Sequence, residues 1–436
     1  MSHAVVVVGA GAAGLSAALA LRERGVEPLL LEAEERAGGK LQTESRRGFL
    51  LEHAALGLLD RSGELAGLCA RLGIVLRPAS MAASLRFVER NETVHALPRG
   101  PAEALRTRVL TIREKIGLLG EPFRSAAPED STVAEFFAHR LGPAGRFLGD
   151  AIQTGIYAGD PDRLELRSAF PTLAALAASG RGSLVRGAIA ARKGKDQKPR
   201  ARLASFRGGM RELVEALSGR TSPRLGTAVR ALRRAGTAYR LHVESGGQAS
   251  EIEADRVIVA VPAPQAADLL DAFDPALAQR LRKLEAAPIS LVHLAVRPHD
   301  VDPLHRGFGL LRPGKAVLGA LFPAALWPER APEGQALLSA LVGGVRHPST
   351  ASLGDAELVQ LVRDELRLRQ PSELLRVVRW PQAIPQYAPG HASRVAEIER
   401  LTSAHAGLRL TGAWYRGAGV LDCLRDGRKT AEALLK

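Results

Sequence analysis

The sequence predicts an α/β fold in which one parallel sheet is assembled from separated pieces of the chain, with other material inserted between them. A β-branched run at residues 4–8 opens the chain and passes through a glycine-rich turn into a helix. A second β-branched run occupies residues 254–262, and a short strand at residues 408–412 precedes a closing helix at residues 426–435. Strands that alternate with helices favour a parallel sheet. The length of 436 residues corresponds to two or three domains.

The N-terminal segment has the pattern of a βαβ unit. Residues 4–8 form a short, almost purely β-branched strand of the kind that is buried in parallel sheets. Apolar residues then recur at helical spacing over residues 15–24, and Gly25 ends that helix. Residues 26–31 predict a second strand, which ends on Glu32.

Glycines at positions 9, 11 and 14 lie between the first strand and the helix, and each has its own physical use. Gly9 permits the tight turn, Gly11 lets the backbone approach a pyrophosphate, and Gly14 allows close packing of helix and strand. The helix N-terminus adds free N–H groups and the positive end of its dipole. Glu32, at the tip of the second strand, can accept hydrogen bonds from a ribose. The segment therefore predicts a dinucleotide-binding site.

The residues that follow Glu32 distinguish two classes of dinucleotide. Arg36 and the pair Gly38-Gly39 come soon after the acid, whereas an NAD-binding unit would continue into another simple crossover. Paired glycines let the backbone approach a large ligand a second time. The E-x-x-x-R-x-G-G pattern resembles the extended fingerprint of FAD enzymes in the amine oxidase superfamily, in which these residues lie along the pyrophosphate and the flavin.

Residues 99–204 differ in composition from the rest of the chain, because strand signals fade and Ala, Leu and Arg dominate. Apolar spacing predicts helices over 102–119, 132–141, 145–153 and 168–178, with prolines between them. We therefore expect a helical unit between the pieces of the sheet.

The net charge of +14 invites a nucleic-acid interpretation, but no recognition motif follows and aromatic residues make up only 4%. We predict no nucleic-acid partner. A basic run at residues 192–202 fits either a solvated loop or a patch for anionic lipid headgroups. Cys69 and Cys423 cannot form a disulfide framework and fit a reducing compartment such as the cytoplasm. No apolar run is long enough for a spanning helix, and glycines interrupt the N-terminal stretch that imitates a signal peptide.

Four further stretches resemble a single family. They are residues 150–160 (DAIQTGIYAGD), 307–311 (GFGLL), 379–391 (with RWPQAIPQY and GH) and 412–423 (GAWYRGAGVLDC). With the N-terminal fingerprint they are similar to the oxygen-dependent protoporphyrinogen oxidases, which include coproporphyrinogen III oxidases of the same type. The resemblance covers essentially the whole chain. It implies that FAD takes six electrons from a porphyrinogen in heme biosynthesis, and that O2 reoxidises the flavin and gives H2O2.

The resemblance also implies a domain organisation. It comprises a Rossmann-like FAD-binding domain of the amine oxidase type, a mixed-sheet substrate domain and a helical domain that touches a membrane surface. The FAD-binding domain would take residues 1–80, 205–262 and 379–436, the substrate domain 81–98 and 263–378, and the helical domain 99–204. A peripheral position on an anionic membrane surface and a homodimer are both compatible with the resemblance.

Family roles transfer to the matching positions of this sequence. Because the flavin supplies the redox chemistry, no side chain is assigned as a catalytic acid or base and no metal site is expected. The residues implied to bind FAD are Gly9, Ala10, Gly11, Ala12, Ala13, Gly14, Glu32, Ala33, Arg36, Gly38, Gly39, Lys40, Ala54, Ala55, Leu56, Gly57, Val229, Trp380, Gly419, Val420 and Leu421. The residues implied to bind the substrate are Arg86, Gly155, Phe308, Leu311, Leu341 and Ile384. Arg86 would pair with a propionate, and Phe308 and Leu311 would enclose the tetrapyrrole.

The sequence departs from the family pattern beside the expected flavin. Members carry E-x-G-P-[NH]-S, whereas this chain has EHAALG at residues 52–57, and Ala413 and Leu421 each replace a usual Asn. Two alternatives therefore stay open. One is another FAD-dependent amine oxidase or polyene desaturase of the superfamily, and the other is a catalytically silent paralogue that binds tetrapyrroles. Protoporphyrinogen IX and coproporphyrinogen III both stay open as substrates.

Overall fold

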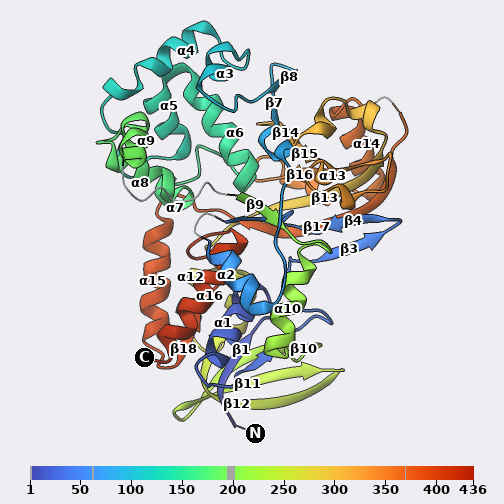
Figure 1. Ribbon diagram of the computed structural model, residues 1–436. Coiled ribbons are helices and arrows are strands. Elements are labelled where there is room, and N and C mark those ends of the chain that lie inside the picture. The colour runs from blue at the N-terminus through green and yellow to red at the C-terminus, as the bar shows by residue number, and fades with distance from the viewer. Residues whose placement is uncertain (1, 61–62, 194–201, 369) are drawn as a thin grey trace.

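The computed structural model describes residues 2–60, 63–193, 202–368 and 370–436. Both chain termini lie at one end of the molecule, and helices between residues 101 and 193 form the opposite end (Figure 1). Within the described ranges, no helix is long and apolar enough to cross a membrane.

A six-stranded sheet joins the beginning, the middle and the end of the chain. Its strands are β1 (Ser2–Val8), β2 (Leu29–Leu31), β10 (Thr227–Ala235), β11 (Ala238–Ser245), β12 (Gln248–Val259) and β18 (Leu408–Leu410). The main order is β10-β11-β12-β1-β2, and β18 pairs with β12. The pairs β1–β12, β1–β2 and β12–β18 are parallel. The predicted assembly of one parallel core from separated pieces is thereby confirmed.

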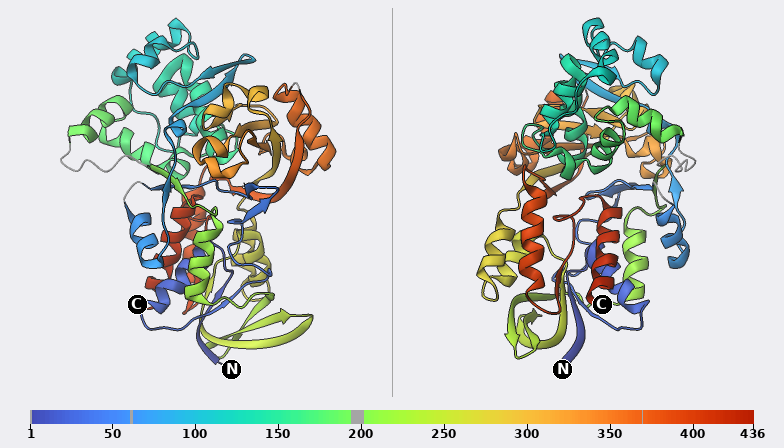
Figure 2. Two further views of the ribbon diagram at one scale, coloured as in Figure 1. Left: turned by 45° about the vertical axis from the view of Figure 1, so that its right-hand side comes forward. Right: turned by 90° about the vertical axis from the view of Figure 1, so that its left-hand side faces the viewer.

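Helices cover both faces of this sheet, as the right-hand view of Figure 2 shows. One face carries α1 (Ala12–Arg22), α2 (Glu64–Leu72), α10 (Arg211–Thr221) and α16 (Val420–Leu434). The other face carries α11 (Ala263–Leu270), α12 (Pro275–Arg282) and α15 (His391–Ser403). Because the apolar faces of α11 and α12 are buried on this sheet, the structure places residues 263–282 with its core, beyond the predicted boundary at residue 262.

The turn between β1 and α1 requires glycine at two positions. Gly9 has φ +99°, in a region that L side chains rarely adopt. A Cβ on Gly14 would lie 1.8 Å from the Gly9 carbonyl oxygen and 3.2 Å from the Ala260 side chain. The backbone of α1 thus packs directly on the strand ends, as the glycine pattern predicts. α1 begins at Ala12, earlier than the predicted residue 15, because Gly11 is its N-cap.

A mixed seven-stranded sheet forms a second body. Its strands are β7 (Arg86–Arg90), β8 (Thr93–Ala96), β13 (Ala286–Val296), β14 (Gly309–Leu311), β15 (Val317–Leu321), β16 (Ala336–Gly343) and β17 (Glu373–Pro385). They are ordered β17-β13-β16-β15-β14-β7-β8, and only the β14–β7 pair is parallel among these neighbours. α14 (Asp355–Glu365) packs on one face. The predicted boundary at 378/379 falls inside β17, which continues this sheet to Pro385.

The helical end of the molecule contains seven α-helices in the described part of the chain. They are α3 (Pro101–Arg106), α4 (Ile112–Leu119), α5 (Val133–Leu141), α6 (Gly145–Tyr157), α7 (Leu166–Ala169), α8 (Pro171–Ser179) and α9 (Leu184–Lys193). The predicted helix over 102–119 is wrong, because Thr111 and Glu114 form a capping box that starts a separate helix. Pro171 similarly starts α8 and divides the predicted helix over 168–178. Within the predicted basic run, residues 194–201 lie outside the described residues.

Two small sheets lie between the large bodies (Figure 1). β3 (Thr43–Arg46) and β4 (Phe49–Glu52) form a hairpin. β9 (Arg202–Ser205) pairs with both β5 (Leu58–Asp60) and β6 (Arg77–Pro78). Apolar side chains of β4 pack on the seven-stranded sheet, which fixes the hairpin between the two bodies; this cluster contains Phe49, Leu51, Ala295, Leu337 and Leu375.

Candidate functional site

The two glycine segments of the fingerprint lie side by side although α1 and β2 separate them in the sequence. The Gly38 N–H donates to the Ala10 carbonyl over 2.8 Å, and Gly11 forms a parallel bridge with Gly38. A Cβ on Gly39 would lie 3.6 Å from the Gly11 Cα, and a Cβ on Gly11 would meet no described atom within 4 Å. The N-terminus of α1 therefore opens onto a backbone-lined space of the kind that a pyrophosphate requires.

Glu32 directly follows β2, and its hydrogen bonds reach the turn after β1 and the start of β10. Its Oε2 accepts a hydrogen bond from the Ala10 N–H over 2.7 Å, and its Oε1 accepts one from the Glu34 N–H over 3.0 Å. Each carboxylate oxygen can accept a further bond. The Thr227 N–H donates to the Glu32 carbonyl, which brings the start of β10, and with it Val229, to this end of the sheet.

The two basic residues of the fingerprint differ in their surroundings. Arg36 is exposed, as are Ala33 and Glu35, and in the described ranges Arg36 makes no ion pair. The Lys40 Nζ instead donates to the Gln382 and Ala383 carbonyls of β17, the second over 2.6 Å. Burial lowers the pKa of Lys40 to about 8. Arg36 is thus available to an anion, whereas Lys40 connects the glycine pair to the seven-stranded sheet.

The C-terminal motif reaches the same place through the packing of α16 on α1. A Cβ on Gly427 would lie 2.1 Å from the Ala13 carbonyl oxygen, and the Ser16 hydroxyl donates to the Leu424 carbonyl over 2.6 Å. α16 starts at Val420, six residues before the predicted start, with Gly419 as its N-cap. Ala12, Ala55, Val420 and Leu421 belong to one hydrophobic cluster with Ala10.

Residues 53–57, which replace the family's Gly-Pro turn, are held at both ends by tryptophans. The Trp380 indole N–H donates to the His53 carbonyl over 2.6 Å. At the other end Leu56 packs against Trp327, and a Cβ on Gly57 would lie 3.2 Å from the Trp327 ring. Ala54 and Ala55 lie between these contacts and are half-buried.

Four of the predicted substrate residues form two separate contacts near the paired strands β7 and β14. The Arg86 guanidinium lies 4.9 Å from the centre of the Phe308 ring. A Cβ on Gly155 would lie 3.1 Å from the Leu311 side chain, so the backbone of α6 approaches that leucine closely. Arg86 and Gly155 are exposed, and Phe308 and Leu311 are partly exposed. The first contact places an exposed cation over an aromatic ring, and the second places an aliphatic side chain against exposed helix backbone.

The other two predicted substrate residues occupy a neighbouring cluster. Leu341 of β16 and Ile384 of β17 pack with Ala158, which follows α6 directly. Sequence reasoning missed Ile152 and Ile156, which are 38% and 54% exposed on the same face of α6 as Gly155. Their i, i+4 spacing around the QTG segment was the available signal.

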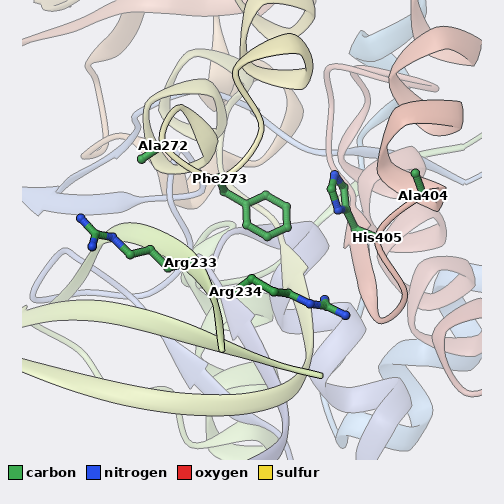
Figure 3. A pocket seen from close by; sticks show the side chains of 6 residues that line it. All are labelled: Arg233, Arg234, Ala272, Phe273, Ala404 and His405. Atoms are coloured by element: carbon green, nitrogen blue, oxygen red, sulfur yellow. The ribbon is translucent and has the colours of Figure 1, made fainter. Parts of the chain in front are cut away.

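One open pocket lies away from these residues. It has a volume of about 640 Å³ and is bordered by the end of β10, the turn between α11 and α12, and the end of α15 (Figure 3). Figure 3 shows Arg233 and Arg234 pointing in different directions, with Phe273 above them and His405 on the side toward which Arg234 points. Since none of the predicted cofactor or substrate residues borders this pocket, it is not part of the candidate site.

Comparisons with known proteins agree with this geometry. The family model described as "Flavin containing amine oxidoreductase" matches residues 12–435. A coproporphyrinogen III oxidase of Bacillus subtilis is 30% identical over 97% of this chain and 96% of its own length. Protoporphyrinogen oxidase 1 of Arabidopsis thaliana is 30% identical over 98% of this chain and 87% of its own. A solved candidate protoporphyrinogen oxidase from Exiguobacterium sp. 255-15 has a TM-score of 0.82 at 26% identity and covers 99% of this chain and 98% of its own.

Proposed function

The chain belongs to the flavin-containing amine oxidoreductase family, and from this premise we propose that it oxidises a porphyrinogen to the porphyrin with FAD as cofactor. The membership confirms the predicted FAD-dependent oxidoreductase of the amine oxidase type. The observation that supports the proposal is the pair of contacts near β7 and β14, Arg86 with the Phe308 ring and Leu311 with the Gly155 backbone.

The residues around the glycine segments fit FAD. The open backbone at Gly11 and Gly39, together with Arg36, would hold the pyrophosphate, and Glu32 would hold the ribose. Residues 53–57, Trp380 and the start of α16 would border the ring system. When bound, FAD accepts hydride equivalents from a reduced substrate.

The chemistry of the predicted substrate residues suits a large apolar ring that carries anionic side chains. Phe308, Leu311 and the exposed isoleucines of α6 supply apolar walls, and Arg86 supplies a planar cation for a propionate. Binding there would exclude water and place a ring edge beside the Gly155 backbone. The curated relatives are named for both coproporphyrinogen III and protoporphyrinogen, and both are retained as substrates of this site. We further propose that O2 is the electron acceptor and H2O2 the product.

Turnover of both porphyrinogens, measured side by side, tests the proposal. The purified FAD-loaded protein should convert at least one colourless porphyrinogen to a fluorescent porphyrin, with O2 consumed. The Arg86→Met variant should raise KM with less effect on kcat, because it removes a charge that binds the substrate and does not react. A flavin-loaded protein that oxidises neither porphyrinogen would overturn the proposal.

The same measurement separates the two alternatives. An amine oxidase or polyene desaturase would oxidise a member of an amine and polyene panel and leave both porphyrinogens unchanged. A silent paralogue would bind porphyrin but retain FAD poorly; the replacement of the Gly-Pro turn by Ala54-Ala55 motivates that alternative. The complete phosphate-binding geometry at Gly9 to Gly14 favours the enzyme.

We propose an anionic membrane surface as a further partner of the helical end. Four apolar side chains project from α4 and the adjoining η2 (Glu121–Phe123); they are Ile112 (77% exposed), Ile116 (64%), Leu119 (70%) and Phe123 (85%). α9, which contacts η2, adds Val185 and Ile189 and the exposed Arg186 and Arg192. An apolar strip flanked by arginines suits an anionic bilayer surface.

Vesicle flotation tests this surface. The protein should float with vesicles rich in phosphatidylglycerol and much less with pure phosphatidylcholine. The Ile116→Asp/Phe123→Asp variant should lose flotation and keep porphyrinogen turnover in solution. Flotation that the double variant leaves unchanged would contradict this position for the membrane surface.

A further inference from the structure

A buried ion pair joins the FAD-binding part of the molecule to the seven-stranded body. Glu52 ends β4, and Arg330 ends η6 (Pro328–Arg330), which follows α13 (Pro323–Leu326). Their side chains are 4% and 0% exposed, and the Arg330 Nη1 donates to the Glu52 Oε1 over 2.9 Å. The two residues are 278 positions apart in the sequence.

Each partner is held by further hydrogen bonds. The Glu52 Oε2 accepts from the Thr43 hydroxyl over 2.7 Å, and its Oε1 also accepts from the Met210 N–H, at the start of α10, over 3.1 Å. The Arg330 Nη2 donates to the Ser205 hydroxyl over 2.8 Å and to the Phe206 carbonyl over 3.1 Å. The pair thus connects the β3–β4 hairpin, β9, the start of α10 and η6.

The pair fixes both ends of the segment at residues 53–57. At the first end, Glu52 directly precedes His53. At the other end, the Arg330 guanidinium lies 5.6 Å from the centre of the Trp327 ring, and Trp327 packs against Leu56. Because the Glu52–Arg330 pair holds both ends of residues 53–57, we expect this segment to move when the pair is lost.

This sequence needs such support because it lacks the family's Gly-Pro turn. Proline fixes its own φ, so Ala55 has more conformational freedom than the family's proline, although Ala54 has less than the family's glycine. The fixed orientation must then come from contacts outside the segment.

We propose that Glu52 and Arg330 are positioning residues that hold residues 53–57 against the flavin. The inference rests on the proposed function only in that FAD occupies this site. Neither residue transfers an electron or a proton to the substrate. Their loss would change how tightly FAD binds and at what potential it is reduced, because the backbone beside its ring system would no longer be fixed.

The test uses the full-length apoprotein and FAD alone as the probe. The Arg330→Met variant should bind FAD at least about tenfold more weakly by flavin fluorescence quenching, a loss of about 1.4 kcal/mol. Its bound flavin should also show a shifted midpoint potential. The Arg330→Lys variant, which keeps the charge, should recover part of the affinity.

Two controls separate positioning from a general loss of stability. The Arg140→Met variant breaks another fully buried ion pair, Arg140–Glu121, in the helical end, and should leave FAD affinity unchanged. Thr43→Val removes the hydrogen bond to Glu52, and also the one that the Thr43 hydroxyl accepts from the Arg211 N–H, with little change of shape. It should weaken FAD binding, whereas Thr221→Val, at the far end of α10, should not.

Equal FAD affinity and potential in the wild type and in folded Arg330→Met and Thr43→Val would overturn the proposal. So would an equal weakening of FAD binding in Arg330→Met and Arg140→Met. Because these measurements involve no porphyrinogen, a protein that fails to oxidise porphyrinogens yet shows the Arg330 effect would lose the proposed function and keep this inference.

Discussion

Two buried Glu–Arg pairs occupy different parts of the molecule and differ in their electrostatics. Glu121–Arg140 lies within the helical end, and Glu52–Arg330 joins the two large bodies. Both carboxylates lie at a helix N-terminus, since Glu121 accepts from the Leu184 N–H of α9 and Glu52 from the Met210 N–H before α10. Their pKa values nevertheless shift in opposite directions.

The balance between the cost of burial and the hydrogen bonds received explains the difference. Burial raises the pKa of Glu52 to about 7, and the donors Arg330, Thr43 and Met210 only partly offset it. Burial acts on Glu121 in the same direction, but hydrogen bonds from Ser183, Arg140, Leu184 and Val185 outweigh it and lower its pKa. The carboxylate of the pair inside the helical end therefore receives more hydrogen bonds than the carboxylate of the pair between the two bodies.

Breaking each pair should give the largest effects. At pH 8, above the pKa of both carboxyls, the Glu121→Ala and Glu52→Ala variants should each lose about 3–5 kcal/mol of unfolding free energy, because each leaves an uncompensated buried arginine. Denaturant unfolding measures the loss. Only Glu52→Ala should also weaken FAD binding; weaker FAD binding in Glu121→Ala would show that the pairs do not differ in role.

The pH dependence of stability should have opposite signs for the two carboxyls. The pKa of Glu52 is raised from 4.5 to about 7, so its contribution to stability is full below pH 4.5 and is lost as the pH rises through 7. Relative to Glu52→Gln, the unfolding free energy of the wild type should fall by up to about 3 kcal/mol over that range. The adjacent His293 stays neutral there, because burial lowers its pKa to about 3.

Glu121 supplies the reference for that experiment. Its pKa is lowered, so its contribution is present above pH 4.5 and is lost only as the pH falls below that value. Urea unfolding at pH 5 to 8 should show a constant difference between the wild type and Glu121→Gln. A constant difference for Glu52→Gln as well would contradict the raised pKa.

Hydrogen-bond partners of the pairs should give smaller effects. Ser183 donates to Glu121 over 2.6 Å, and Ser205 accepts from Arg330 over 2.8 Å. Replacing either serine by alanine should cost about 1–3 kcal/mol. Thermal unfolding gives the cost, and a FAD titration should show weaker binding for Ser205→Ala alone. An unchanged FAD affinity in Ser205→Ala would show that the hydrogen bond between Ser205 and Arg330 does not affect the FAD site.

The smallest expected effect concerns the helical end alone. Thr111→Ala removes the N-cap of α4 and should cost about 1 kcal/mol of stability. Porphyrinogen turnover and FAD affinity should remain those of the wild type. A larger cost, or a change in turnover, would show that α4 is coupled to the site more tightly than its position suggests.

Local chemistry explains why much of the site could be predicted. Gly9 and Gly14 are required by a turn whose constraints lie within a few residues, and the strand that ends on Glu32 is adjacent in sequence. The later motifs could be placed only through resemblance. Arg330 could not be found, because nothing in its surrounding sequence indicates an ion pair with a residue 278 positions away. The interruption of the predicted helix over 102–119 has a local sequence signal, because Thr111 and Glu114 form the capping box that starts α4.

Porphyrinogen oxidation is tested by anaerobic mixing of the FAD-loaded protein with coproporphyrinogen III and, separately, protoporphyrinogen IX. We expect the flavin absorbance to bleach with at least one of them, and admission of O2 to restore the colour while porphyrin fluorescence grows. A flavin that neither porphyrinogen bleaches, but that an amine or a polyene does, would contradict it.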